Sequence, residues 1–409
     1  MADFEVDVDP AEAGFDATRL ARIDAHFDRY VDNGRLPGWL AVVSRHGRIV
    51  HVGRGGYRDV EAALPVETDT LWRIFSMTKP ITSVAAMMLA EEGLLELDDP
   101  IAQWLPEFAS PRVYVKGSAL APATEPATSP IRVWHLLTHT AGLTYGFHHG
   151  HPVDAIYRAA GFEWGTPRGA DLAECCAQWA ALPLLFQPGT EWNYSVATDV
   201  LGRLVEVVSG LPLDEFFASR IFTPLGMTDT AFVAPTPARL AAMYVRDPAS
   251  GRAVRNDAFG RWGAARPDCL SGGGGLVSSA PDYWRFTEML LRGGALDGVR
   301  LLSPRTVALM ASNHLPGRVD LEAFGRPLFA EMPFDGHGFG LGFSVLEDPV
   351  KARTLSSAGE FAWGGAASTA FWVDPDEDLT VGFYTQLLPS STYRLRPQLR
   401  QLVYQALVD

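Results

Sequence analysis

The stretch Ser76-Met77-Thr78-Lys79 decides how the fold of this chain is interpreted. An apolar stripe at helical spacing follows it, which predicts a helix from Ser76 to Glu92 that ends at Gly93. Residues three apart share one face of a helix, so the amine of Lys79 can lie beside the hydroxyl of Ser76. The simplest alternative is that Ser76 only caps the helix and that Lys79 is a solvated charge.

The scarcity of lysine makes Lys79 informative. The chain has three lysines, Lys79, Lys116 and Lys351, beside many arginines. Arginine cannot replace a lysine that must lose its proton, because the pKa of arginine stays above about 12. A serine hydroxyl becomes a nucleophile when a neighbouring base takes its proton, and the N–H groups of a first helical turn can stabilise an oxyanion. The pair therefore indicates acyl transfer.

Composition sets the class of protein. The chain has 409 residues, of which 47% are hydrophobic and 20% charged, as in a globular protein with two interlocked domains. A net charge of −14 argues against a nucleic-acid or anionic-membrane surface. The acidic stretch Met1–Asp7 does not resemble a signal peptide, and Cys175, Cys176 and Cys269 form no disulfide framework. We therefore expect a cytoplasmic protein with buried cysteines.

Strand signals lie at both ends of the chain and helical signals fill the middle. Asp16 is expected to cap a first helix, and His46-Gly47 is expected to form a tight hairpin turn. Predicted strands span Trp39–Ser44, Arg48–Val52, Phe343–Leu346, Thr369–Val373 and Leu379–Gln386. Further helices are predicted at Arg132–Leu137, Leu172–Leu182, Val196–Val208, Leu213–Ile221, Ala280–Arg292 and Arg394–Val408, and a surface excursion at 105–131.

This order of elements predicts an α/β fold of the α+β type. An antiparallel sheet flanked by helices would be built from both ends of the chain, with a mostly helical domain inserted. We place the sheet domain at residues 1–75 and 295–409 and the helical domain at 76–294.

Two more candidate sites accompany Ser76 and Lys79. Tyr194 follows a Pro-Gly turn and a polar run and precedes a helix, and a neighbouring ammonium would lower the pKa of its phenol, so it could act as a base. Trp363-Gly364-Gly365-Ala366 leads into a strand, where adjacent glycines suggest close approach of a backbone or ligand. The alternatives are a buried tyrosine with a satisfied hydroxyl and a bulge with a packed tryptophan.

Together these motifs resemble the family VIII carboxylesterases, which belong to the class C β-lactamase and penicillin-binding-protein superfamily. The resemblance covers nearly the whole chain. It is supported by the stretches His135–Leu143, Pro224–Met227, Ser271–Leu276 and Gly338–Phe343. It implies a β-lactamase/transpeptidase-like fold with the active site in the cleft between the two domains.

The resemblance also implies roles for individual residues. Ser76 would be the nucleophile, with Lys79 and Tyr194 as its general base pair. The backbone N–H groups of Ser76 and Ala366 would form the oxyanion hole. Trp363, with Gly364 and Gly365, would line the substrate pocket.

Two departures from the β-lactamase pattern bear on the substrate. Those enzymes have Lys-Thr-Gly at the third motif, where the cation helps to hold a substrate carboxylate, and this chain has Trp363 instead. They also have an asparagine two residues after the tyrosine, and this chain has Val196. Both changes favour an uncharged ester over a penicillin.

Other motifs in the chain indicate no further catalytic or metal site. His148, His149 and His151 could bind zinc, but no carboxylate or cysteine ligand is evident nearby, so we predict a loop at the rim of the cleft and no metal. His135 and His139 are expected to make hydrogen bonds. Gly272–Gly275 is followed by no Gly-Lys-Ser/Thr, so it is not a phosphate loop, and the chain contains no Gly-x-Ser-x-Gly.

The sequence thus predicts a serine esterase that hydrolyses short-chain carboxylic esters, without a cofactor and with a small-molecule ester as its partner. An acyltransferase of the same fold, which passes the acyl group to an alcohol, remains open. So do a β-lactamase or DD-peptidase and, from another class, a non-catalytic ligand-binding module.

Overall fold

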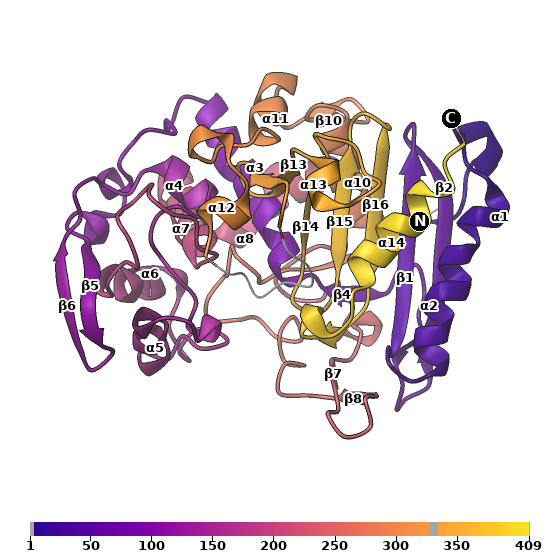
Figure 1. Ribbon diagram of the computed structural model, residues 1–409, viewed down its shortest axis with the longest axis horizontal. Coiled ribbons are helices and arrows are strands. Elements are labelled where there is room, and N and C mark those ends of the chain that lie inside the picture. The colour runs from indigo at the N-terminus through magenta and orange to yellow at the C-terminus, as the bar shows by residue number, and fades with distance from the viewer. Residues whose placement is uncertain (1–3, 327–333, 409) are drawn as a thin grey trace.

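The sheet domain takes strands from both ends of the chain (Figure 1). The computed structural model describes residues 4–326 and 334–408, so part of the acidic start of the chain lies outside it. Within these residues a sheet of eight strands has the order β12-β13-β14-β15-β16-β1-β2-β3, and all of its neighbouring strands are antiparallel. The strands span Gly38–Arg45 (β1), Arg48–Asp59 (β2), Leu64–Pro65 (β3), His337–Phe339 (β12), Ser344–Leu346 (β13), Phe361–Gly364 (β14), Ala370–Asp374 (β15) and Leu379–Tyr384 (β16). The predicted antiparallel sheet from both ends is confirmed.

Strand β1 joins the two ends of the chain because it pairs with β2 on one side and β16 on the other. Its turn to β2 is formed by His46 and Gly47, whose φ values of 57° and 72° suit the tight hairpin that was predicted. Alternate side chains of β1 enter different cores: Leu40 lies in the larger hydrophobic cluster and Trp39 in the smaller one. Both faces of the sheet are therefore covered.

Two groups of helices cover these faces. The smaller cluster holds side chains of α2 (Arg22–Asp32) and α14 (Leu395–Tyr404), such as Phe27 and Leu399. On the other face α10 (Ala280–Leu291) packs against β15 and β16. Helix α1 (Ala17–Leu20) is capped by the carboxylate of Asp16, as predicted.

The inserted region is mostly helical and is centred on α3 (Thr78–Glu91). Residues 78–89 of α3 are all buried, as expected of a helix surrounded by protein, and α3 packs along α7. The other helices of this region are α4 (Val133–Leu137), α5 (Pro152–Ala159), α6 (Leu172–Ala181), α7 (Ala197–Ser209), α8 (Leu213–Phe217) and α9 (Thr223–Leu225). The division into domains at 75/76 and 294/295 stays a prediction.

Short elements complete the described chain. They are the strands β4 (Leu71–Arg73), β7 (Tyr244–Arg246), β8 (Ala253–Arg255), β9 (Val277–Ser279), β10 (Ala295–Leu296), β11 (Val299–Arg300) and β17 (Leu387–Leu388), and the helices α11 (Pro304–Met310), α12 (Leu321–Phe324) and α13 (Pro349–Ala352). In the part of the chain that the structure describes, no helix combines the length and apolar character needed to cross a membrane.

Three local features differ from the sequence prediction. The helix predicted from Ser76 begins as a 3-10 turn, Phe75–Met77, before α3 starts. The surface excursion at 105–131 contains a hairpin of β5 (Arg112–Ser118) and β6 (Ala121–Pro126), whose side chains are mostly exposed and so lack an apolar alternation. Helix α8 is shorter than predicted because a π-helical turn, Ala218–Phe222, follows it.

Candidate active site

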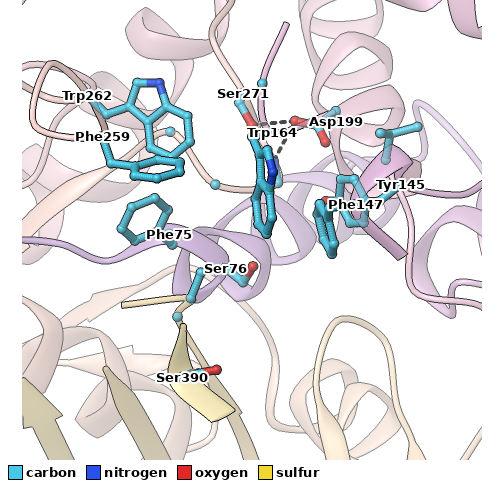
Figure 2. Close-up of a pocket in the computed structure, with 18 of the residues that line it drawn as sticks. Phe75, Ser76, Tyr145, Phe147, Trp164, Asp199, Phe259, Trp262, Ser271 and Ser390 are labelled. Carbon is cyan, nitrogen blue, oxygen red and sulfur yellow. Dashed lines mark hydrogen bonds between the residues drawn. The ribbon is translucent and has the colours of Figure 1, made fainter. Parts of the chain in front are cut away.

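Ser76 lies where strand β4 passes into α3, at the wall of a cavity of about 600 Å³. The preceding residue, Phe75, has a φ of 43°, a left-handed conformation that is costly for a bulky side chain. Strain of this kind is found where surrounding structure holds a residue for a functional purpose. Figure 2 shows the hydroxyl of Ser76 beside this cavity.

The amine of Lys79 is buried next to Ser76. The side chain is 1% exposed, and Nζ lies 3.3 Å from the Oγ of Ser76. Nζ also donates to the hydroxyl of Tyr145 at 3.1 Å and to the carbonyl oxygen of Gly273 at 2.7 Å. The helical spacing of Ser76 and Lys79 thus places the two groups together, and two more groups fix the position of the amine.

A carboxylate lies behind this lysine. The side chain of Asp199 is buried and accepts hydrogen bonds from the hydroxyl of Ser271 and from the N–H of Gly273 at 3.0 Å (Figure 2). Burial raises the pKa of Asp199, and the charge of Lys79 acts in the opposite direction. Gly273 therefore links the two side chains, with its N–H on the carboxyl group of Asp199 and its carbonyl on the amine of Lys79.

Tyr194 contacts the lysine through its ring. Nζ of Lys79 lies 4.5 Å from the centre of that ring, and the Tyr194 hydroxyl accepts a hydrogen bond from Nε1 of Trp363 at 3.4 Å. The ring of His139 lies 5.0 Å from that of Tyr194, and burial lowers the pKa of His139 well below its ordinary value, so it is neutral. Its Nδ1 is within 3.2 Å of the hydroxyl of Ser195.

The third motif ends strand β14 beside the nucleophile. A Cβ atom added to Gly365 would lie 2.4 Å from the carbonyl oxygen of Ile74, so only glycine allows this close approach. Arg396 fixes the same turn by donating to the carbonyl oxygens of Gly365 at 2.9 Å and Thr369 at 3.0 Å. The strand is thereby held against the chain that leads to Ser76.

The backbone N–H groups of Ser76 and Ala366 are the predicted oxyanion hole. Ser76 and Ala366 both line the cavity. Within the hydrogen bonds of residues 4–326 and 334–408, neither of their N–H groups donates to a protein acceptor. Trp363 lines the same cavity and is 8% exposed.

Sequence reasoning missed two residues of this site. Tyr145 lies two residues after the stretch His135–Leu143. Its place next to a family motif could have drawn attention to it. Burial raises the pKa of Tyr145 well above its ordinary value, which keeps its phenol protonated. Asp199 lies in the first turn of α7 and carries no sequence signal of its own.

The histidines near the cavity make separate contacts. Nε2 of His148 bonds the carbonyl oxygen of Tyr194 at 2.7 Å, His149 lies 3.6 Å from Glu163, and His151 caps α5. Among the described residues no cluster of histidine, cysteine and carboxylate groups could hold a metal ion. All three cysteines are buried.

Most of the chain, including the residues of the site, is similar to known proteins. The model of the β-lactamase family matches residues 23–405 of the chain. The chain belongs to the β-lactamase family. Its fold agrees with the mixed α/β architecture predicted from sequence.

Within the β-lactamase family the chain resembles esterases. Protein Rv1367c from Mycobacterium tuberculosis is 40% identical over 88% of each chain. Esterase EstB from Burkholderia gladioli is 36% identical over 97% of this chain and 98% of its own. The solved structure of EstCE1, described as a hydrolase with promiscuous acyltransferase activity, has a TM-score of 0.80 and 30% identity over 95% of this chain and 98% of its own. The predicted place among the family VIII carboxylesterases of this superfamily is confirmed.

Proposed function

We propose that this protein is a serine esterase that hydrolyses short-chain carboxylic esters through an acyl-enzyme on Ser76. The observation that carries the proposal is the position of Lys79, a buried amine 3.3 Å from the Oγ of Ser76. The similarity to EstB and EstCE1 supports the same conclusion.

Acylation begins with attack by Ser76. As Oγ bonds to the ester carbonyl carbon, the pair of Lys79 and Tyr194 accepts its proton. The N–H groups of Ser76 and Ala366 stabilise the negative charge that develops on the carbonyl oxygen. The tetrahedral intermediate then collapses, and the alcohol leaves with a proton from the same pair.

Deacylation reverses these roles. Water takes the place of the alcohol, loses a proton to Lys79 and Tyr194, and attacks the acyl carbon. The carbon–Oγ bond breaks, Ser76 recovers its proton, and the acid leaves. Asp199, on the other side of Gly273, can compensate the positive charge that Lys79 gains with each proton it accepts.

Two positions in the wall of the cavity favour a neutral ester over a β-lactam. Trp363 and Val196 both line it, where a β-lactamase would offer a cation and an amide. Trp363 directs its indole N–H to Tyr194 and leaves an apolar ring for the ligand. An ester without charge meets no unpaired polar group at these two positions.

Acyl transfer to an alcohol is the second candidate function. The promiscuous acyltransferase activity named for EstCE1 and the apolar walls of the cavity favour it, because a bound alcohol could displace water at the acyl-enzyme. The products formed from p-nitrophenyl acetate with and without a bulky primary alcohol distinguish the two functions. Transfer is the main activity if the new ester exceeds free acetate.

A panel of substrates tests the proposed function. We expect the purified protein to hydrolyse p-nitrophenyl acetate and butyrate at least about a hundredfold faster, in kcat/KM, than a chromogenic cephalosporin. The reason is the loss of the cation and amide that a β-lactam substrate would use. Comparable rates on the cephalosporin would instead assign the protein to β-lactam hydrolysis, and no turnover of any ester would refute the proposal.

The two tyrosines next to Lys79 are expected to differ in their effects. Tyr194→Phe should lower kcat/KM by about 10²–10⁴-fold, as loss of a proton-transfer group does. Tyr145→Phe should cost only about tenfold, because the protonated Tyr145 hydroxyl positions the amine of Lys79. Steady-state kinetics on p-nitrophenyl acetate measures both. A greater loss in Tyr145→Phe would assign the proton transfer to Tyr145.

A further inference from the structure

Six aromatic side chains form a continuous series of ring contacts along the cavity that contains Ser76. We name this series the aromatic arc; in order of contact it comprises Tyr145, Phe147, Trp164, Phe259, Trp262 and Phe75. Neighbouring ring centres lie between 4.7 and 6.1 Å apart. The arc starts at the residue that bonds Lys79 and ends at the residue before Ser76.

The arc has two sides and a bridge. Figure 2 shows Phe75, Phe259 and Trp262 on one side of Ser76 and Phe147 with Tyr145 on the other, with Trp164 between them. Tyr145, Phe147 and Trp164 stack with interplanar angles of 19° and 13°. The remaining contacts are edge-to-face, so flat ring faces are left for a ligand.

The loops that carry the arc are held in place by hydrogen bonds. Arg73, three residues before Ser76, donates to the carbonyl oxygens of Ala241, Gly260 and Trp262. The N–H of Gly169, in the loop after Trp164, donates to the carboxylate of Asp268 at 2.8 Å. The arc is therefore a formed surface of the protein, prepared before a ligand arrives.

Trp164 is the unusual member of the arc. Its side chain is 48% exposed, whereas Phe75 at the other end is 7% exposed. A tryptophan left half in water at the wall of an apolar cavity gains free energy when a ligand covers it. The charged groups on the same loops that line the cavity are Arg168, Arg261, Arg266, Glu163 and Asp268. They sum to one positive charge, which disfavours a cationic ligand.

We propose that the aromatic arc binds the alcohol half of the ester, and that this half is a large, flat ring system without positive charge, such as an arylmethyl or fused-ring alcohol. The proposal rests on the esterase function given above. A cavity of about 600 Å³ has the size of sites that bury drug-sized ligands, roughly 300–1,000 Å³, and a short-chain ester alone leaves most of it empty.

The geometry assigns the arc to the alcohol half. The leaving oxygen receives its proton from the pair at Lys79, and the first ring of the arc, Tyr145, bonds that lysine. At the other end of the arc Phe75, Phe259 and Trp262 pack in one cluster with Ala366, on the side of the predicted oxyanion hole. The alcohol half is therefore assigned to the end that runs from Tyr145 through Phe147 to Trp164. The alcohol must also leave in every turnover, and the arc contains the exposed side chain of Trp164.

Two acetates with leaving groups of similar acidity test this proposal. We expect wild-type protein to hydrolyse 2-naphthylmethyl acetate at least about tenfold faster, in kcat/KM, than n-propyl acetate. Trp164→Ala should lower this ratio by about tenfold, because the larger part of the loss falls on the ester whose alcohol stacks on the ring. Trp164→Phe keeps a ring and should retain most of the preference. Tyr57→Ala removes an aromatic side chain that is 43% exposed outside the arc and should change nothing.

Binding of free 2-naphthylmethanol, measured by calorimetry, separates this proposal from the esterase function. If wild-type protein binds the alcohol and Trp164→Ala binds it about tenfold more weakly, the proposal for the arc is supported. This holds even if neither acetate is hydrolysed, although the absence of hydrolysis would refute the esterase function. If wild-type protein and Trp164→Ala hydrolyse both acetates with the same ratio of kcat/KM values, the proposal for the arc is wrong and the esterase function stands. Failure of wild-type protein to bind the alcohol also overturns the arc.

Discussion

Replacing Ser76 with alanine is expected to lower kcat/KM for p-nitrophenyl acetate by at least about a thousandfold. The Oγ of Ser76 is the atom to which the acyl group would be attached, and its neighbour at 3.3 Å is the amine of Lys79. Without that oxygen no acyl-enzyme can form, and the remaining groups can only orient the ester toward water. Steady-state hydrolysis rates check this expectation.

Two further measurements make the result specific to Ser76. Ser390→Ala removes a hydroxyl from another wall of the same cavity and should retain activity within a few-fold. A fluorophosphonate should add to wild type and to Ser390→Ala, but not to Ser76→Ala, as seen in the intact mass. Full ester turnover by Ser76→Ala would eliminate the acyl-enzyme mechanism and favour another catalytic group.

The local part of the site could be predicted because a helix fixes its geometry. A spacing of three residues brings Ser76 and Lys79 together whatever the rest of the fold does. The conformation of Phe75 could not be predicted in this way. A left-handed φ at a phenylalanine is imposed by tertiary structure and has no marker in the local sequence.

The groups that surround Lys79 depend on distant parts of the chain. Tyr145 is 66 residues away, and the carbonyl of Gly273 is 194 residues away. Such contacts follow from the packing of whole elements, which a single sequence does not encode in any periodic pattern. Tyr194 is an exception, because its place between a Pro-Gly turn and a helix made it a candidate, and its motif accompanies Ser-x-x-Lys in a known family.

The fold, like the site, could be predicted from the sequence only in part. The sheet was predicted because its strands, such as Trp39–Ser44, are continuous runs of β-forming residues buried on both faces. The hairpin of β5 and β6 was not, because alanine, proline and threonine dominate residues 121–126 and few of its side chains are buried. Prediction therefore succeeded where burial leaves a pattern in the sequence.

The burial of Lys79 poses a free-energy problem that the site solves locally. After Lys79 has accepted a proton from Ser76 or water, its ammonium is 1% exposed and must be paired or hydrogen-bonded, since an isolated buried charge is costly. Asp199 supplies the opposite charge through Gly273, and the carbonyl of Gly273 accepts a hydrogen bond from Nζ. The charge balance is maintained without a direct ion pair that would hold the amine away from Ser76.

Lys79→Arg should abolish most activity, although it keeps the positive charge. If Lys79 acts as a base, kcat/KM for p-nitrophenyl acetate should fall by about 10²–10⁴-fold, because an arginine does not give up its proton at any ordinary pH. Lys79→Met, which has neither charge nor base, should show a loss of similar size. Rates for the three proteins, with thermal unfolding to confirm that each is folded, provide the measurement.

The scarcity of lysine supplies a matched control for this prediction. Lys116 is exposed on β5, so Lys116→Arg makes the same exchange away from the cavity and should leave the kinetics unchanged. If the charge of Lys79 alone supported catalysis, Lys79→Arg would keep the activity that Lys79→Met loses. That outcome would leave Tyr194 or Tyr145 as the base, and the retention of this lysine in an arginine-rich chain would then reflect only the space available beside Ser76.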